Sequence, residues 1–255
     1  MILITNDDGI YAPGLAAVRD ELRGEEATVV APDMEQSGAA HSITVHLPLR
    51  VRKINIKGEF LGYAVSGSPA DCVKVAICEL LGERPAAVLS GINYGANLGV
   101  SVLYSGTVAG ALEGAMFGVP SIAFSLEYSE NPLFSQAARF VRTIYHHFSE
   151  HPLPPGTLLN VNIPAIPADQ IQGMKATRMS RGVYNERFEK RYDPRGGAYY
   201  WVCGDIDQSD AAEGTDIHAI ANGFISITPI HYDMSDYRLL EALGGAGSPI
   251  LELGP

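Results

Sequence analysis

The chain has 255 residues, of which 46% are hydrophobic and 18% are charged, a composition typical of a globular protein in water. Its formal net charge of -11 argues against a nucleic-acid polymer as the main partner, whereas a small anionic substrate remains compatible if a bound cation reverses the local field. No apolar run is long enough to span a bilayer, and Met1 opens directly into a strand without a signal peptide. We therefore expect a cytoplasmic protein that does not bind membranes.

The apolar residues 1–4 predict a short buried strand that leads into two adjacent carboxylates, Asp7 and Asp8. Burial of both without a compensating charge would cost several kcal/mol. A hard divalent cation such as Mg²⁺ supplies that charge, because it binds carboxylate and carbonyl oxygens, and Gly9 lets the backbone turn beside it. The alternative is a polar turn after a strand, since Asn, Asp and Gly all favour turns.

Residues 15–22 carry apolar side chains at helical spacing, and residues 27–31 form a second apolar strand. A strand, a helix and a strand in this order predict a βαβ unit with parallel strands. Ligands of such sheets bind beyond the carboxyl ends of the strands, which places the two aspartates at the same edge as the polar loop 33–42. Ser37 in this loop could donate an oxygen to a metal or phosphate, although a lone loop serine is more often simply solvated.

We expect strand pieces, broken at Pro48, over residues 43–56 and a further strand over residues 60–65. A helix then begins at an N-cap, Ser68, with Asp71 reaching back to it, and continues to about residue 81.

The three cysteines, Cys72, Cys78 and Cys203, show no spacing typical of a zinc site. Two of them fall in the helix that begins at Ser68. We expect all three to pack as small hydrophobic side chains in a reducing compartment rather than to form disulfides.

A buried strand is predicted at residues 86–90, and the segment after it is rich in glycine, asparagine and hydroxyl side chains. Ser105 and Thr107 flank the start of a helix over residues 108–117. Backbone N–H groups at a helix start bind anions, so this stretch could hold a phosphate. The alternative is simple capping of a helix of small residues, and the pattern is neither GxGxxG nor a Walker A loop.

Further along, we expect a strand at 121–125, a helix at 133–148 and a strand at 158–163. The histidines near the end of that helix, His146, His147 and His151, are interpreted as surface residues. The C-terminal part adds a helix capped by Thr215, a late strand at 224–229 and a terminal helix at 236–243. We divide the chain into a catalytic core, residues 1–164, and a C-terminal part, residues 165–255, within one continuous domain.

Two strand-like runs rich in charge and aromatic side chains surround a turn at residues 193–197, which predicts a protruding β-hairpin over about residues 180–204. Exposed aromatic residues on such an arm favour a subunit interface. The alternative is a hairpin that folds back over the rim of the active site.

Several short motifs follow one another along nearly the whole chain: residues 5–9 (TNDDG), 31–37 (APDMEQS), 41–44 (HSIT), 66–73 (SGSPADCV), 90–97 (SGINYGAN), 104–108 (YSGTV), 162–164 (NIP), 193–196 (DPRG), 215–216 (TD) and 225–229 (ISITP). In their identity and order they resemble the SurE family, the stationary-phase survival proteins. The resemblance implies a Rossmann-like α/β fold with a mostly parallel sheet and helices on both faces. It also implies a homodimer, sometimes within a tetramer, formed through the C-terminal hairpin and tail.

The resemblance further implies a metal-dependent phosphomonoesterase that acts on nucleoside 5′- and 3′-monophosphates and, in some members, on short polyphosphate. One divalent ion per subunit, Mg²⁺ or Mn²⁺, is then expected. By position in the motifs, the metal ligands are Asp7, Asp8, Ser37 and Asn93. The phosphate-binding residues by the same criterion are Asn97, Ser105, Gly106 and Thr107, with Asn6 nearby.

The residue pattern and the family resemblance lead to one hypothesis, in which a cation on Asp7 and Asp8 polarises a phosphoryl oxygen and orients the attacking water. Asn97 and the helix start at residues 105–107 would hold the other oxygens. One carboxylate could also act as base or nucleophile. The rivals are a covalent aspartyl phosphatase and a non-catalytic nucleotide-binding module on the same fold.

Overall fold

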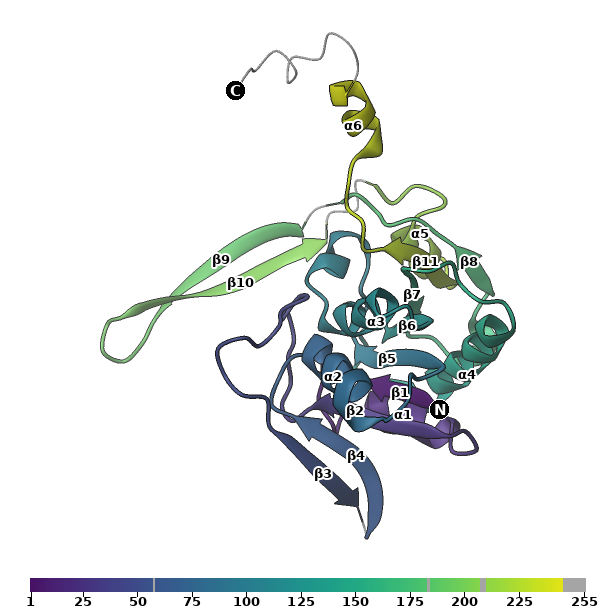
Figure 1. Cartoon of the computed structure of the whole chain (residues 1–255). Helices are drawn as coiled ribbons and strands as arrows, with labels where there is room; N and C mark the ends of the chain where they lie inside the picture. Colours follow the sequence, from purple (N-terminus) through teal and green to yellow (C-terminus); the bar gives the residue numbers. More distant parts are fainter. Residues whose placement is uncertain (57, 183, 207–209, 245–255) are drawn as a thin grey trace.

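The computed structural model describes residues 1–56, 58–182, 184–206 and 210–244. Within them, one large sheet forms the centre of the molecule (Figure 1). Its strand order is β3 (Val51–Ile56), β4 (Glu59–Val65), β2 (Ala27–Pro32), β1 (Ile2–Thr5), β5 (Ala87–Tyr94), β6 (Ser121–Leu126), β7 (Thr157–Ile163), β11 (Ile225–His231) and β8 (Met174–Ala176).

The centre of the sheet is parallel, as the βαβ pattern predicts. β1 pairs in parallel with both β2 and β5, and the parallel run continues through β6 to β7. Antiparallel pairing joins β3 to β4 and β11 to β7. Because β8 and β11 join this sheet, part of the C-terminal region shares the sheet of the N-terminal core.

Helices cover both faces of the sheet, and the side chains of β1 show why. Ile2 and Ile4 pack with α1 (Pro13–Glu21) and α4 (Phe134–Glu150), whereas Leu3 between them packs with α2 (Pro69–Val75). Alternate side chains of a strand point to opposite faces, so a continuous apolar run is buried on both. The α/β fold with two helical layers is confirmed.

Helix α3 (Gly106–Met116) lies unusually close to the sheet. Three glycines at spacing i, i+4 face the strands. A Cβ on Gly106 would lie 2.8 Å from the Asp7 Cβ, and one on Gly110 would lie 3.0 Å from the Ser90 Oγ. Only glycine fits this approach, which brings the start of α3 against the end of β1.

The start of α2 carries the predicted capping box, in which Ser68 Oγ accepts from Asp71 N and the Asp71 carboxylate accepts from Ser68 N. The helix ends at Val75 and continues as a π-helical turn, Ala76–Leu80, which the sequence did not predict. The expected strand pieces before Pro48 are wrong, since strand structure begins only at Val51. The Asp71 carboxylate also accepts from Thr44 N and Oγ1, so this segment docks on the helix start instead.

The expected packing of the cysteines is right for only one of them. Cys72 is buried under the sheet, whereas Cys78 and Cys203 are exposed, and all three are free thiols. Cys78 lies on the outer side of the π-helical turn, and Cys203 lies on the hairpin.

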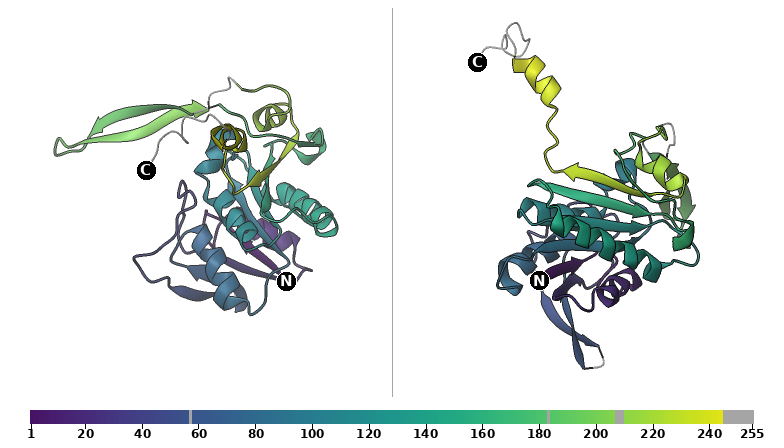
Figure 2. Two further views of the ribbon diagram at one scale, coloured as in Figure 1. Left: turned by 45° about the horizontal axis from the view of Figure 1, so that its top comes forward. Right: turned by 90° about the vertical axis from the view of Figure 1, so that its right-hand side faces the viewer.

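The predicted hairpin is present as β9 (Tyr184–Tyr192) and β10 (Ala198–Ile206), a separate two-stranded sheet. Figures 1 and 2 show that the hairpin and helix α6 (Tyr237–Gly244) extend away from the body. α5 (Asp216–Ala221) begins at the predicted cap, Thr215, and short 3₁₀ turns occupy Gly99–Leu103 and Ala168–Gln170. Among the described residues, no helix combines the length and apolarity that a membrane span needs.

Candidate active site

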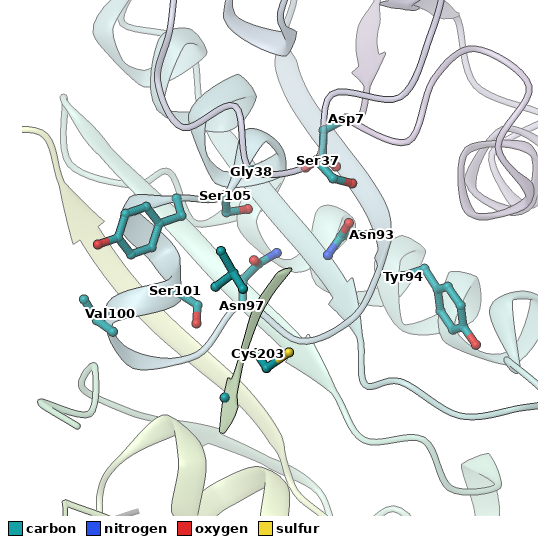
Figure 3. A pocket seen from close by; sticks show the side chains of 13 residues that line it. Asp7, Ser37, Gly38, Asn93, Tyr94, Asn97, Val100, Ser101, Ser105 and Cys203 are labelled. Atoms are coloured by element: carbon teal, nitrogen blue, oxygen red, sulfur yellow. The ribbon is translucent and has the colours of Figure 1, made fainter. Parts of the chain in front are cut away.

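A cavity of about 480 Å³ opens beyond the carboxyl ends of β1 and β5 (Figure 3). Its lining consists of Asp7, Ser37, Gly38, Asn93, Tyr94, Asn97, Val100, Ser101, Tyr104, Ser105, Val202, Cys203 and Gly204. Five of the predicted site residues therefore share one cavity: Asp7, Ser37, Asn93, Asn97 and Ser105. This is the edge at which parallel α/β sheets bind ligands.

Asp7 is held rigidly at the base of this cavity. Its side chain is buried, Thr107 Oγ1 donates a hydrogen bond to Asp7 Oδ1, and Gln36 N donates to the Asp7 backbone oxygen at 2.7 Å. Burial raises the pKa of Asp7 above its ordinary value, and the hydrogen bond from Thr107 opposes that rise. The result is a fixed carboxylate that has lost most of its water.

Asp8 is half-buried beside it. Burial, and then the charge of Asp7, raise the pKa of Asp8 to about 6, while the Tyr94 N–H lowers it by donating to the carboxylate. The groups that lower the pKa of either aspartate are hydrogen-bond donors rather than cations. Two desolvated carboxylates side by side thus lack an opposite charge, which is the situation that a bound cation relieves.

Ser37 and Asn93 complete a set of oxygen donors around Asp7. Asn93 Nδ2 donates to Gly95 O at 2.7 Å, and Figure 3 shows the side-chain oxygen of Asn93 on the side of Ser37. Ser37 Oγ donates to Glu35 Oε1 at 2.7 Å, which leaves its oxygen available as an acceptor.

The described residues contain no group of three His, Cys, Asp or Glu side chains placed to hold a metal. The donors here are of another kind: two carboxylates, a hydroxyl and an amide. All four supply oxygen, the ligand atom that Mg²⁺ and Mn²⁺ prefer, so the predicted residues fit a hard divalent cation.

Asn97 is anchored by a buried amide network. Its backbone N donates to Asn162 Oδ1 at 2.7 Å, its backbone oxygen accepts from Asn160 Nδ2 at 2.8 Å, and its own Nδ2 donates to Ser125 Oγ at 2.8 Å. Asp216 Oδ2 accepts from Gly99 N at 2.8 Å, so the same loop is also held from α5. Buried side chains that hydrogen-bond to the same stretch of backbone fix a loop in one geometry, although Asn160 Oδ1 itself has no hydrogen-bond partner.

Of the remaining predicted phosphate-site residues, Ser105 belongs to the cavity lining, whereas Asn6, Gly106 and Thr107 do not. Ser105 lines the cavity and also caps α3, since its Oγ accepts from Val108 N at 3.1 Å. Gly106 and Thr107 are buried, and the Thr107 hydroxyl is engaged with Asp7. Asn6 is also buried, with Nδ2 donating to Gly9 O at 3.0 Å and Oδ1 lacking a hydrogen-bond partner. Thr107 therefore holds Asp7, Gly106 allows the start of α3 to approach it, and Asn6 bonds to the turn at Gly9.

An ion-pair cluster missed by the sequence analysis surrounds Glu113, a buried carboxylate on α3 whose two partners are partly exposed. The Glu113 carboxylate lies 2.6 Å from Lys74 Nζ and 2.7 Å from His41 Nε2. Burial pushes the pKa of Glu113 up, but the hydrogen bonds from His41 and Lys74 outweigh it and hold that pKa below its ordinary value. Glu113 thereby ties the loop that carries Ser37 to two helices.

The comparison with protein-family models matches residues 2–186 to the survival protein SurE. The chain belongs to the SurE family. A relative from Thermosipho africanus, named 5′-nucleotidase SurE, is 48% identical over 243 residues, which are 95% of each chain. A second, from Heliobacterium modesticaldum and with the same name, is 48% identical over 257 residues, or 98% of this chain and 94% of the relative.

A solved SurE structure has the same fold. The crystal structure of the SurE protein from Aquifex aeolicus superposes with a TM-score of 0.84 at 42% identity, and covers 95% of this chain and 97% of that one. Membership of the SurE family thus confirms the resemblance that the ordered motifs indicate.

Proposed function

We propose that this SurE-family protein is a nucleotidase that hydrolyses nucleoside 5′-monophosphates to nucleoside and inorganic phosphate with a divalent cation. The observation that carries the proposal is the pair of desolvated carboxylates, Asp7 and Asp8, beside a cavity that also contains Ser37, Asn93 and Asn97. Full-length relatives that are nearly half identical bear the name 5′-nucleotidase SurE, which supports the same activity here.

In this proposal, Asp7, Asp8, Ser37 and Asn93 hold one Mg²⁺ or Mn²⁺. The bound cation supplies Lewis acidity for a phosphoryl oxygen and a means of generating hydroxide near neutral pH. The protein's own part is orientation, since Thr107 fixes Asp7 and the amide network fixes Asn97.

Phosphate oxygens then bind to the Asn97 side chain and to the Ser105 hydroxyl at the start of α3. One carboxylate of the Asp7 and Asp8 pair would also accept the proton of the attacking water. Nucleoside 3′-monophosphates and short polyphosphate present the same terminal phosphoryl group, so we propose them as further substrates.

The deciding experiment measures phosphate release from AMP, GMP and p-nitrophenyl phosphate with Mn²⁺ or Mg²⁺, and then with excess EDTA. We expect turnover of all three with metal and its loss in EDTA, restored by added cation. Binding of AMP without phosphate release would favour the non-catalytic module, and an acyl-phosphate trapped on Asp7 or Asp8 would favour covalent catalysis.

We further propose that the protein is a homodimer, or a dimer within a tetramer, joined through the hairpin and α6. Exposed apolar side chains on both elements support this: Phe188, Tyr200 and Trp201 on the hairpin, and Tyr237, Leu239 and Leu240 on α6. The tail beyond residue 244, which was also expected to take part, lies outside the described residues. Light scattering of the full chain and of a chain ending at residue 235 would test the assembly, with a monomeric full chain contradicting it.

A further inference from the structure

One wall of the cavity comes from the hairpin rather than from the sheet. Residues 202–204 of β10 line the cavity, although β10 pairs only with β9 among the described strands. In Figure 3, Cys203 lies on the far side of Asn93 and Asn97 from Asp7. The arm that was predicted mainly as an interface therefore also closes one side of the proposed active site.

This wall differs chemically from the opposite side. It consists of Val202, Cys203 and Gly204, and the nearby lining adds Val100 and Tyr104. Val202 and Tyr104 are 62% and 57% exposed, so both offer apolar surface that the described residues leave uncovered. Near Asp7, in contrast, the lining is made of carboxylate, hydroxyl and amide groups.

Two hydrogen bonds hold the backbone of Tyr104 in place. Tyr104 N donates to Ser101 O at 3.1 Å, and its backbone oxygen accepts from Ala40 N at 3.1 Å. An aromatic side chain on a held backbone can stack on a flat, uncharged ring at little cost in entropy.

The cavity is also larger than inorganic phosphate requires. A volume of about 480 Å³ falls in the range of pockets that enclose whole small molecules, and inorganic phosphate would fill only the oxygen-lined end. A nucleoside monophosphate has the matching two-ended character, with a dianion at one end and a flat neutral base at the other.

We propose that Tyr104 and residues 202–204 of β10 form the surface that binds the nucleoside, and that they thereby determine which phosphate esters this enzyme prefers. The proposal rests on the nucleotidase function above. It assigns residues 202–204 of the hairpin a role in substrate selection within their own subunit.

Cys203 provides a direct probe of this surface, and Cys78 provides the matched control, because both thiols are exposed but only Cys203 lines the cavity. The full-length protein with Mg²⁺ is alkylated with iodoacetamide, alone, with inorganic phosphate, or with a nucleoside 5′-methylenephosphonate that cannot be hydrolysed. Mass spectrometry then gives the alkylation rate of each cysteine.

At an analogue concentration about ten times its dissociation constant, we expect alkylation of Cys203 to slow about tenfold. Alkylation of Cys78 should be unchanged, and phosphate alone should protect neither thiol. An unprotected Cys203 at a concentration that calorimetry shows to be saturating, or a Cys203 that does not react without ligand, would overturn the assignment.

A second measurement distinguishes a role of this wall in binding the nucleoside from a role in the catalytic step. Tyr104→Ala should raise the KM for AMP about tenfold through lost stacking, leave kcat nearly unchanged, and leave kcat/KM for a small alkyl phosphate unchanged. Tyr11 is also exposed, at 67%, and lies outside the cavity lining, so Tyr11→Ala is the control and should leave the kinetics of both substrates unchanged.

If Tyr104→Ala lowered kcat/KM equally for both substrates, or left kcat/KM for AMP unchanged, the specificity role would be contradicted while the nucleotidase function stands. Absence of phosphate release from every ester by the wild-type protein would instead overturn the proposed function.

Discussion

The oxygen-lined floor of the cavity and its hairpin wall differ in how firmly the rest of the protein holds them. Asp7 and Asn97 on the floor are buried and bonded to residues distant in the sequence, such as Thr107 and Asn162. Val202 on the wall is largely exposed and belongs to an arm whose strands pair only with each other among the described residues. Groups that handle the reacting phosphoryl must be placed within a fraction of an ångström, whereas a surface for a flat base can adapt.

The largest effect is expected at the floor. Asp8→Asn should reduce AMP hydrolysis by at least about a hundredfold, because it removes a negative charge that would hold the cation, and the cation would neutralise the reacting phosphoryl group. Steady-state kinetics with Mn²⁺ would measure it. Asp33→Asn, which changes a carboxylate at the end of the neighbouring strand β2, serves as the control. Near-normal activity of Asp8→Asn would refute the metal assignment.

Substitutions in the body of the protein and in the hairpin should differ in how much they lower the free energy of unfolding. Glu113→Ala leaves Lys74 and His41 without their shared buried partner, so the free energy of unfolding should fall by about 2 kcal/mol. Arg195→Ala at the hairpin tip should change it by less than about 0.5 kcal/mol. Urea titrations of both variants would test the contrast, and equal effects would show that the hairpin is held as firmly as the core.

Thr107→Val tests whether orientation of Asp7 matters for turnover. Loss of a hydrogen bond to a charged group should lower kcat by about tenfold. It should also raise the pKa of Asp7, since this hydrogen bond lowers it, and move the acid limb of the pH profile to higher pH. Thr143→Val on the exposed face of α4 is the matched control. An unchanged profile would indicate that the Thr107 hydroxyl serves packing alone.

The last prediction concerns the pH dependence of stability without metal. The pKa of Asp8 is raised in the folded state from 3.8 to about 6, so the folded protein binds this proton more tightly than the unfolded chain. Its contribution is therefore fully present below about pH 4 and is lost as the pH rises through about 6. In EDTA, wild type should lose stability relative to Asp8→Asn as the pH rises from about 4 to about 6. A constant difference would mean that Asp8 is not desolvated.

Local features were predictable because they depend on neighbours in the sequence. The capping box at Ser68 and Asp71, the cap at Thr215 and the hairpin turn at Asp193 each involve residues within a few positions, and the structure contains all three. The failure at residues 43–50 has the opposite cause. The local sequence pattern of these residues is typical of a strand. The backbone N–H of Thr44 instead donates to Asp71, 27 positions away, so the segment docks on a helix start rather than pairing with a strand.

The position of two carboxylates after the first buried strand of a parallel α/β sheet was predictable from the chain alone, since apolar periodicity and the βαβ order follow from local composition. Their surroundings come from long-range packing: Thr107 holds Asp7, the amides of Asn160 and Asn162 hold Asn97, and residues 202–204 of the hairpin line the same cavity. Such contacts join residues up to about a hundred positions apart, and they depend on how the strands are ordered and how closely α3 packs, which no local pattern encodes.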